Sequence, residues 1–158
     1  MRRLRAAAGF TLLELMAVIT IAGILMAIAI PFMGNLSKNS LADKVYRDLE
    51  LDLRYARSQA VTLSKEVSFT PSNNWVEGWV IKDKAAGTTL RQKKFNLDAN
   101  TVTSDDLKTS APLTFSARGY SDKDVKVTIK VEGCTGNRVR VLAINRIGQI
   151  QLDEVKAC

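Results

Sequence analysis

The 158-residue sequence has no histidine, only two cysteines and just 6% aromatic residues. Histidine and cysteine supply most general bases, nucleophiles and zinc ligands, and two cysteines without histidine are too few for an ordinary zinc site. A Gly-rich phosphate loop and the spacing of a metal-binding motif are also missing. We therefore expect no enzymatic activity, no metal site and no cofactor.

The two cysteines, Cys134 and Cys158, both lie in the last part of the chain. We interpret them as a single disulfide, although a count of two does not by itself establish that they pair with each other. Such a bridge would close a loop of about 25 residues and stabilise the fold by about 3 kcal/mol in the chain-entropy model. It would also indicate an oxidising compartment.

Apolar residues are concentrated near the N-terminus and the rest of the chain is polar, although the mean hydropathy of the whole chain is only −0.02 and its net charge is +7. Positions 10–32 form a run of roughly 23 residues, enough to cross about 30 Å of hydrocarbon as a helix. The preceding residues are basic, so the positive-inside rule keeps them cytoplasmic and places the rest outside. The A-x-A pattern of small residues at which signal peptides are cleaved does not follow the run, so we expect the apolar segment to be retained. We expect a single-pass inner-membrane helix over 10–32.

One carboxylate, that of Glu14, interrupts this apolar run. A charged group at such a position costs about 2.5 to 3.5 kcal/mol on insertion scales and is usually paired. The run contains no cation, and Arg5 is more than two helical turns away. We therefore expect Glu14 to find its partner on another chain.

The motif GFTLLE, from Gly9 to Glu14, followed by an apolar helix, resembles the leader junction of type IV pilins and type II secretion pseudopilins. The resemblance implies that a prepilin peptidase cuts after Gly9 and N-methylates Phe10. It also implies that Glu14 pairs with the N-terminal amine of a neighbouring subunit during filament assembly. The implied parts are a leader over 1–9, a filament-core helix over 10–32 and a pilin head over 33–158.

The head begins with apolar residues at three- and four-residue steps from Leu41 to Leu63, which predict an amphipathic helix to about residue 64. Short β-branched and aromatic runs separated by turn residues follow, and they predict antiparallel strands packed on that helix. The expected fold is α+β: one long N-terminal helix, half transmembrane and half amphipathic, packed on an antiparallel β-sheet head.

Within this superfamily the chain most resembles the GspH/FimT family, through ARSQAV at the helix end, WVEGWVIKD around Trp75 and Trp79, and a basic C-terminal strand pair that begins near Cys134. The two tryptophans could stack on nucleic-acid bases. Tryptophans beside a strand more often pack in the core, so we predict a structural role for them.

Positive charge gathers in residues 133–152, which contain Arg138, Arg140 and Arg146 and no acidic residue. Arg138 and Arg140 are two apart in a predicted strand, so their side chains share a face, and we expect a reverse turn near Asn145 to return Arg146 close to them. Clustered guanidinium groups suit phosphate. The alternative is that they keep a sheet edge soluble or pair with acids elsewhere.

FimT-like pilins are implicated in DNA uptake during natural transformation, through a basic C-terminal Gly-Arg-x-Arg motif. Residues 136–140 resemble it, with Asn137 inserted after Gly136. The resemblance implies a minor pilin that binds extracellular double-stranded DNA without sequence preference. The predicted DNA contacts are Arg138, Arg140 and Arg146, with weaker contributions from Lys130, Lys126 and Arg118.

The alternative function is a structural minor pilin, or a GspH-like pseudopilin, that primes filament assembly or protein secretion without binding DNA. In either case the expected partners are other pilin subunits, the prepilin peptidase and, before assembly, the inner membrane. The head is expected in the periplasm first and then in an extracellular pilus.

Overall fold

The computed structural model describes residues 11–158, without the side chains of residues 28–33 and 35. Gly9 and Phe10, the predicted cleavage and methylation positions, lie outside the described residues. Helix α1 (Leu12–Leu63) is the first element, and the chain divides after Leu36 into two compact units. We describe each unit by itself and call residues 37–158 the head.

In the first unit, Thr11 is the N-cap of α1. Thr11 Oγ1 accepts the backbone N–H of Glu14 at 3.2 Å, and Glu14 lies in the first helical turn, where the helix dipole favours an acid. The described apolar side chains of this segment are largely exposed, for example Leu13 at 78%. Among the described residues, none of the helical stretches is both long and apolar enough to cross a membrane. The transmembrane segment predicted over 10–32 is therefore not confirmed.

In the head, α1 buries one apolar face and ends at Leu63, close to the predicted end at 64. Its buried residues recur at three- and four-residue steps: Val45, Leu49, Leu53, Ala56 and Ala60. The helix closes with a Schellman motif, in which the N–H of Lys65 bonds to the Ala60 carbonyl and that of Ser64 to Val61. Ser64 takes the left-handed conformation, with φ of 53°, that this motif requires.

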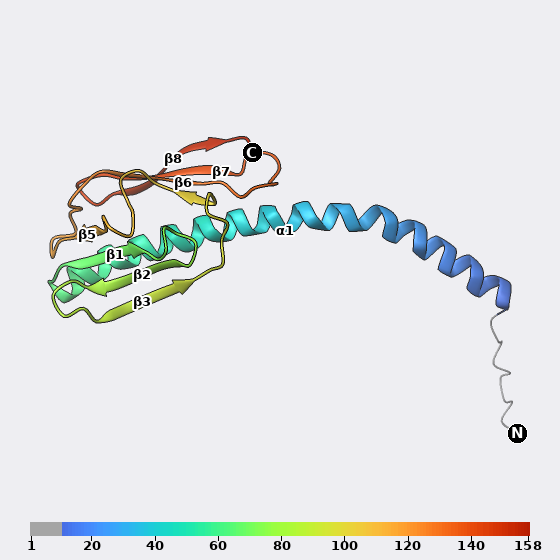
Figure 1. Cartoon of the computed structure of the whole chain (residues 1–158), viewed down its shortest axis with the longest axis horizontal. Coiled ribbons are helices and arrows are strands. Elements are labelled where there is room, and N and C mark those ends of the chain that lie inside the picture. Colours follow the sequence, from blue (N-terminus) through green and yellow to red (C-terminus); the bar gives the residue numbers. More distant parts are fainter. Residues whose placement is uncertain (1–10) are drawn as a thin grey trace, which may run out of the picture. The chain divides into compact units, whose positions relative to one another are not determined.

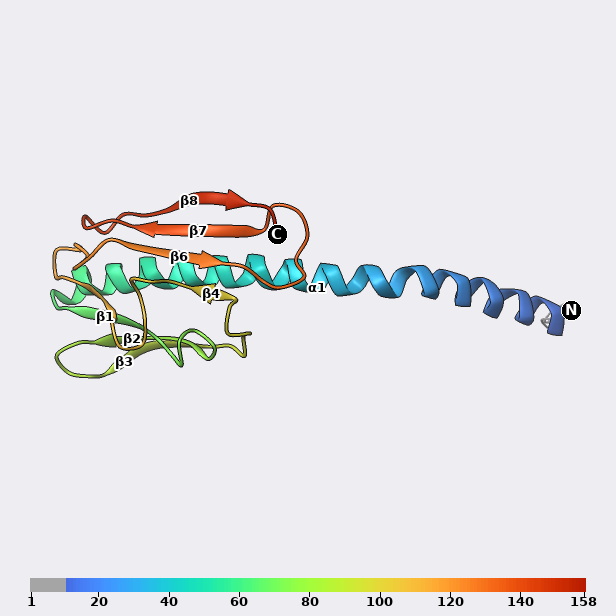
Figure 2. The same ribbon diagram turned by 45° about the horizontal axis from the view of Figure 1, so that its top comes forward.

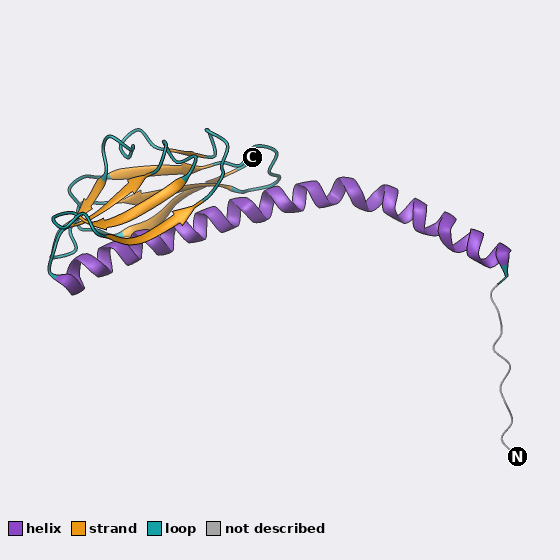
Figure 3. Cartoon of the chain, turned by 60° about the horizontal axis from the view of Figure 1, so that its bottom comes forward, coloured by secondary structure: helices purple, strands orange, loops and turns teal. Residues whose placement is uncertain are grey.

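Two four-stranded antiparallel sheets pack on this part of α1, where a single sheet was expected. Figures 1 and 2 place the C-terminal strands and the β1–β3 group beside different parts of the helix surface, and Figure 3 shows the strands stacked on it. The sheet orders are β3-β2-β1-β5 and β4-β6-β7-β8. The strands are β1 (Val67–Pro71), β2 (Gly78–Asp83), β3 (Thr89–Lys94), β4 (Val102–Thr103), β5 (Leu113–Phe115), β6 (Val125–Ile129), β7 (Val139–Ile144) and β8 (Ile150–Lys156).

The core of the head centres on Trp79, which is fully buried between the helix and the first sheet. Its ring lies 6.0 Å from that of Phe69 and 6.3 Å from that of Trp75, centroid to centroid. Trp79 Nε1–H donates to Asp52 Oδ2 at 2.8 Å, and Arg91 donates to Asp52 Oδ1 at 2.8 Å, so this buried carboxylate has a donor on each oxygen. The prediction that both tryptophans belong to the core is confirmed.

The turn after β2 is built on Asp83, whose Oδ1 accepts the backbone N–H groups of Ala85 and Ala86 at 2.9 Å each. The Ala86 bond is the main cause that lowers the pKa of Asp83 below its ordinary 3.8; burial opposes it, and Lys65, 3.4 Å away, adds to the lowering. A lowered folded-state pKa stabilises the fold above the unfolded value, and that stability is lost as the pH falls through the folded value.

We therefore expect Asp83→Asn to lower the urea midpoint of the head at neutral pH. The difference from the wild type should shrink as the pH falls below 3.8 and through the lowered folded-state pKa, because first the unfolded and then the folded carboxylate becomes protonated. Urea unfolding of the wild type and the variant, followed by circular dichroism at neutral pH and at a pH below 3.8, measures this difference. A difference that stays constant with pH would mean that the carboxylate charge is not the cause.

Candidate functional site

Arg140 is the second residue of β7 and Arg138 directly precedes the strand, and both side chains reach α1. One carboxylate serves both: Arg140 Nη1–H donates to Asp43 Oδ1 at 2.6 Å, and Arg138 Nη1–H donates to Asp43 Oδ2. Residues two apart in a strand point the same way, which explains how two arginines meet one acid. The expected shared face of Arg138 and Arg140 is therefore present, but it is turned toward the helix.

Two further residues of α1 complete the site. The Arg140 guanidinium lies 4.7 Å from the centre of the Tyr46 ring, and Arg47 Nε–H donates to the Asp43 carbonyl at 3.3 Å. Asp43, Tyr46, Arg47 and Arg140 line a surface hollow of about 230 Å³. Burial and then the neighbouring Glu50 carboxylate raise the pKa of the Tyr46 hydroxyl against the lowering influence of Arg140, so this hydroxyl is neutral.

We call Arg47, Arg138 and Arg140 the arginine cluster. The guanidinium groups of Arg138 and Arg140 bind the Asp43 carboxylate, and that of Arg47 binds the main-chain carbonyl of the same residue. Three cations and one carboxylate leave a net charge of +2. The Arg138 side chain is 37% exposed and that of Arg140 is 20% exposed. The cluster is therefore positive and reachable from solvent, yet two of its members are already engaged by an acid, as the alternative interpretation anticipated.

Arg146 is not brought to this cluster, and the expectation that a turn would return it there is wrong. The reverse turn exists, since Gly148 N–H donates to the Asn145 carbonyl at 2.8 Å. Arg146, however, sits in the turn itself, six residues beyond Arg140 and about 20 Å away along an extended strand. Its side chain is 74% exposed, with Nε 3.4 Å from Asp124.

The three weaker candidates are dispersed. Lys126 on β6 donates to Asp153 on β8 at 2.7 Å, and this bond, with the charge of Asp153, raises the pKa of Lys126. Lys130 is exposed and follows Ile129, the cross-strand neighbour of Arg140, so it lies at the cluster's end of the sheet. Arg118 is exposed in the loop whose Ser121 N–H donates to the Arg146 carbonyl, at the other end.

The disulfide between Cys134 and Cys158 is present and joins the loop before β7 to the C-terminus, with the two Cα atoms 5.7 Å apart. Cys158 N–H donates to the Gly136 carbonyl at 2.9 Å, and Thr135 exchanges two hydrogen bonds with Asn39 of α1. Gly136 has φ of +73°, which favours glycine, so its local role is to turn this loop. These bonds hold the approach to Arg138 in place.

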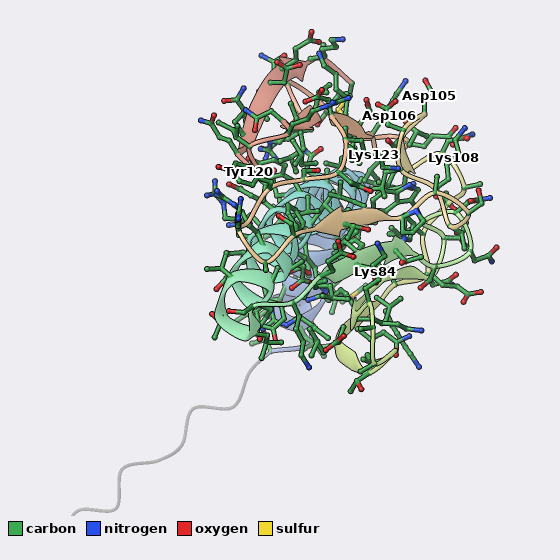
Figure 4. All side chains as sticks on the ribbon, turned by 90° about the vertical axis from the view of Figure 1, so that its left-hand side faces the viewer. Lys84, Asp105, Asp106, Lys108, Tyr120 and Lys123 are labelled. Atoms are coloured by element: carbon green, nitrogen blue, oxygen red, sulfur yellow. A yellow bond between two sulfur atoms is a disulfide. The ribbon has the colours of Figure 1, made fainter. Side chains whose placement is uncertain are left out.

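Three loop carboxylates of the head, those of Asp106, Asp122 and Asp124, accept hydrogen bonds from main-chain N–H groups. Lys123 Nζ donates to the carbonyls of Asp106 and Ala111 at 2.6 and 2.9 Å, and Figure 4 shows Lys123 close to Asp106 at the surface. Within residues 11–158 as described, no group of three or more potential metal ligands occurs.

Sequence reasoning missed Asp43, Tyr46 and Arg47. They stand about 95 residues before Arg138 and Arg140, among the polar positions of an amphipathic helix. The only signal was that any acid on the solvent side of this helix was a potential partner for the basic strand. Nothing in the periodicity distinguished Asp43 from its neighbours, because the pairing is a property of how the sheet lies on the helix.

Comparisons with known proteins agree with this architecture. The family model described as type II transport protein GspH matches residues 46–148, and the prokaryotic N-terminal methylation motif matches residues 4–30. No curated protein matches the chain significantly. Two crystal structures of the type IV minor pilin FimU from Pseudomonas aeruginosa strain PAO1 are similar at 28% identity. The match to the first has a TM-score of 0.60 and covers 75% of this chain and 96% of the FimU chain. The match to the second has a TM-score of 0.57 and covers 73% of this chain and 98% of the FimU chain.

The GspH model covers more than half of the chain, the methylation motif matches its N-terminal part, and the fold is similar to that of a minor pilin. Proteins of this kind are structural and have no enzymatic activity. The chain therefore belongs to the GspH/FimT family of minor type IV pilins and type II secretion pseudopilins.

Proposed function

We propose that this minor pilin binds extracellular double-stranded DNA without sequence preference, for uptake in natural transformation. The observation that carries the proposal is the arginine cluster: three guanidinium groups from α1 and from the start of β7 that all bond to one residue, Asp43, and leave a net positive charge. Guanidinium groups bind phosphate oxygens bidentately, so the cluster suits the DNA backbone. Backbone contacts position DNA and do not read its sequence.

Arg146 would form a second contact. A separation of about 20 Å corresponds to roughly six base pairs along B-DNA, so one duplex could touch both places only across several phosphates. Three phosphate contacts predict a log–log salt slope near −2.7. Such binding is weak for one subunit, and several subunits in a filament would strengthen it by avidity.

Assembly into a filament requires the N-terminal chemistry that the methylation motif supports. In this proposal the prepilin peptidase cuts after Gly9 and methylates Phe10, while the chain is held in the inner membrane. Glu14 then pairs with the N-terminal amine of a neighbouring subunit. The head faces the periplasm and later the outside of an extracellular pilus.

A second candidate function is a purely structural subunit that primes filament assembly or type II secretion. One observation favours it: the ion pairs with Asp43 give Arg138 and Arg140 a role in holding the second sheet on α1. Deletion separates the two functions. Loss of transformation with normal secretion and normal pilus assembly favours DNA binding, whereas a defect in secretion or in pilus assembly favours the structural role.

The direct test is a DNA titration of the head. All residues that are buried in the described chain lie between Ala42 and Ile150, and the disulfide also lies within residues 37–158, so this part has its own core and can be produced alone. We expect Arg138→Gln/Arg140→Gln to weaken binding of a short duplex about tenfold at low salt and to reduce the salt slope by about 0.9 per lost contact. Fluorescence anisotropy gives the affinity, and NMR shifts locate the contacts.

The matched control is Lys94→Gln/Lys108→Gln, which removes the same two charges from exposed positions elsewhere in the head. It should change affinity much less. If the arginine variant folds and binds as the wild type does, the cluster is not the DNA site.

A further inference from the structure

We infer that Asp43 is a built-in competitor for phosphate at the arginine cluster, and that DNA binds there by displacing its carboxylate, with Arg47 as a third contact. This inference rests on the proposed DNA-binding function. It adds two residues of α1 to a site that the C-terminal sequence alone had suggested.

The geometry supports the substitution of one anion for another. Each oxygen of the Asp43 carboxylate accepts one guanidinium N–H, Oδ1 from Arg140 and Oδ2 from Arg138. The two non-ester oxygens of a DNA phosphate could accept from the same pair of donors, and guanidinium groups bind both kinds of anion. Asp43 and a phosphate cannot occupy this place together, so binding at these donors requires the carboxylate to leave.

The site can open without a rearrangement of the backbone. Asp43 has only two side-chain dihedral angles, is partly exposed, and borders the hollow that it shares with Tyr46, Arg47 and Arg140. Arg140 keeps a second support, because its guanidinium also lies on the Tyr46 ring. The cation is therefore still held in place when the carboxylate moves away.

The net charge of the arginine cluster determines whether loss of the Asp43 carboxylate raises or lowers the affinity for DNA. With Asp43 in place the cluster carries +2, and without its carboxylate it carries +3. Arg47 is exposed at the rim of the hollow, one helical turn after Asp43, where it can also contact a phosphate that is bound to the other two arginines. In the free head, Asp43 thus neutralises one of the three positive charges of the arginine cluster.

The test is Asp43→Asn in the head, titrated with a labelled duplex by fluorescence anisotropy over a series of salt concentrations. We expect the affinity to rise about three- to tenfold, because an ion pair no longer has to be broken. The salt slope should stay as in the wild type, since the number of neutralised phosphates is unchanged. The control Asp43→Glu keeps the charge and should not increase the affinity. An unchanged or lower affinity in a folded Asp43→Asn head would overturn the inference, because Asp43 would then only position the arginines.

Two further measurements keep the inference testable if Asp43→Asn does not fold. In the wild-type head, the duplex should shift the NMR signal of the Asp43 carboxyl carbon together with the Nε–H signals of Arg138 and Arg140. A carboxyl signal that stays fixed while the arginine signals move would contradict displacement. Arg47→Gln should weaken binding about threefold; full binding by this variant would remove Arg47 from the site.

Failure of this inference differs from failure of the proposed function. If the duplex binds neither the wild-type head nor Asp43→Asn, DNA binding itself is rejected. If Arg138→Gln/Arg140→Gln weakens binding but Asp43→Asn does not strengthen it, the DNA site stands and only the competition by Asp43 is rejected.

Discussion

Replacement of Trp79 by alanine is expected to lower the free energy of unfolding of the head by about 3 to 5 kcal/mol. The indole is fully buried and lies against the rings of Phe69, Trp75 and Phe95, so its removal leaves a cavity between helix and sheet. It also removes the donor to Asp52 Oδ2 and leaves a buried carboxylate oxygen with one hydrogen bond fewer.

Urea unfolding of residues 37–158, followed by circular dichroism, measures this loss. Trp79→Phe separates its two causes, because phenylalanine keeps an aromatic ring in the core but has no N–H, and we expect it to cost about 1 to 3 kcal/mol. Tyr120→Ala is the control: Tyr120 is 51% exposed at the surface seen in Figure 4, and its loss should change stability by no more than about 0.5 kcal/mol. A similar cost at both positions would show that Trp79 is not central to the core.

Loss of the disulfide is expected to cost about 3 kcal/mol in the double variant Cys134→Ser/Cys158→Ser. The bridge joins residues 24 apart in the chain, and in the chain-entropy model its main effect is to restrict the unfolded state. In the folded head it also secures the end of β8 and the loop that leads to Arg138. We therefore expect the urea midpoint to fall while the strands keep their order.

Reduction of the wild-type head with dithiothreitol should reproduce the stability of the double variant. The same reductant should leave the double variant itself unchanged, which controls for other effects of the reagent. A wild-type head that unfolds at the same urea concentration with and without reductant would contradict the prediction. NMR of the double variant tests the local effect, since the signals of residues 133–140 should move most.

Much of the fold was predictable because local patterns agree with the tertiary structure. The apolar steps from Leu41 to Leu63 predicted a helix that ends within one residue of the observed end. Alternating burial in β1 and β6 matches the period of two that strands impose. The division into two sheets was missed, because it depends on β5 pairing with β1 while β6 pairs with β7, and strand runs alone do not specify partners.

The candidate site was only half predictable. The spacing of Arg138 and Arg140 correctly placed them on one face, since that follows from backbone geometry. Their contact with Asp43 could not be foreseen, because it depends on how β7 lies across α1. The position of Arg146 was predicted wrongly for a related reason: the turn near Asn145 was correct, but a residue in the turn stays at the end of the hairpin.

The sequence by itself determined the elements whose causes are local. These are the amphipathic helix, the strands and the concentration of positive charge after Cys134, together with the motif that identifies the family. The tertiary structure alone decided which charges meet: it set Asp43 between two arginines and left Arg146 apart. The physical reason is that electrostatic partners are determined by distance in space, and a helix packed on a sheet brings together residues that the chain separates by almost a hundred positions.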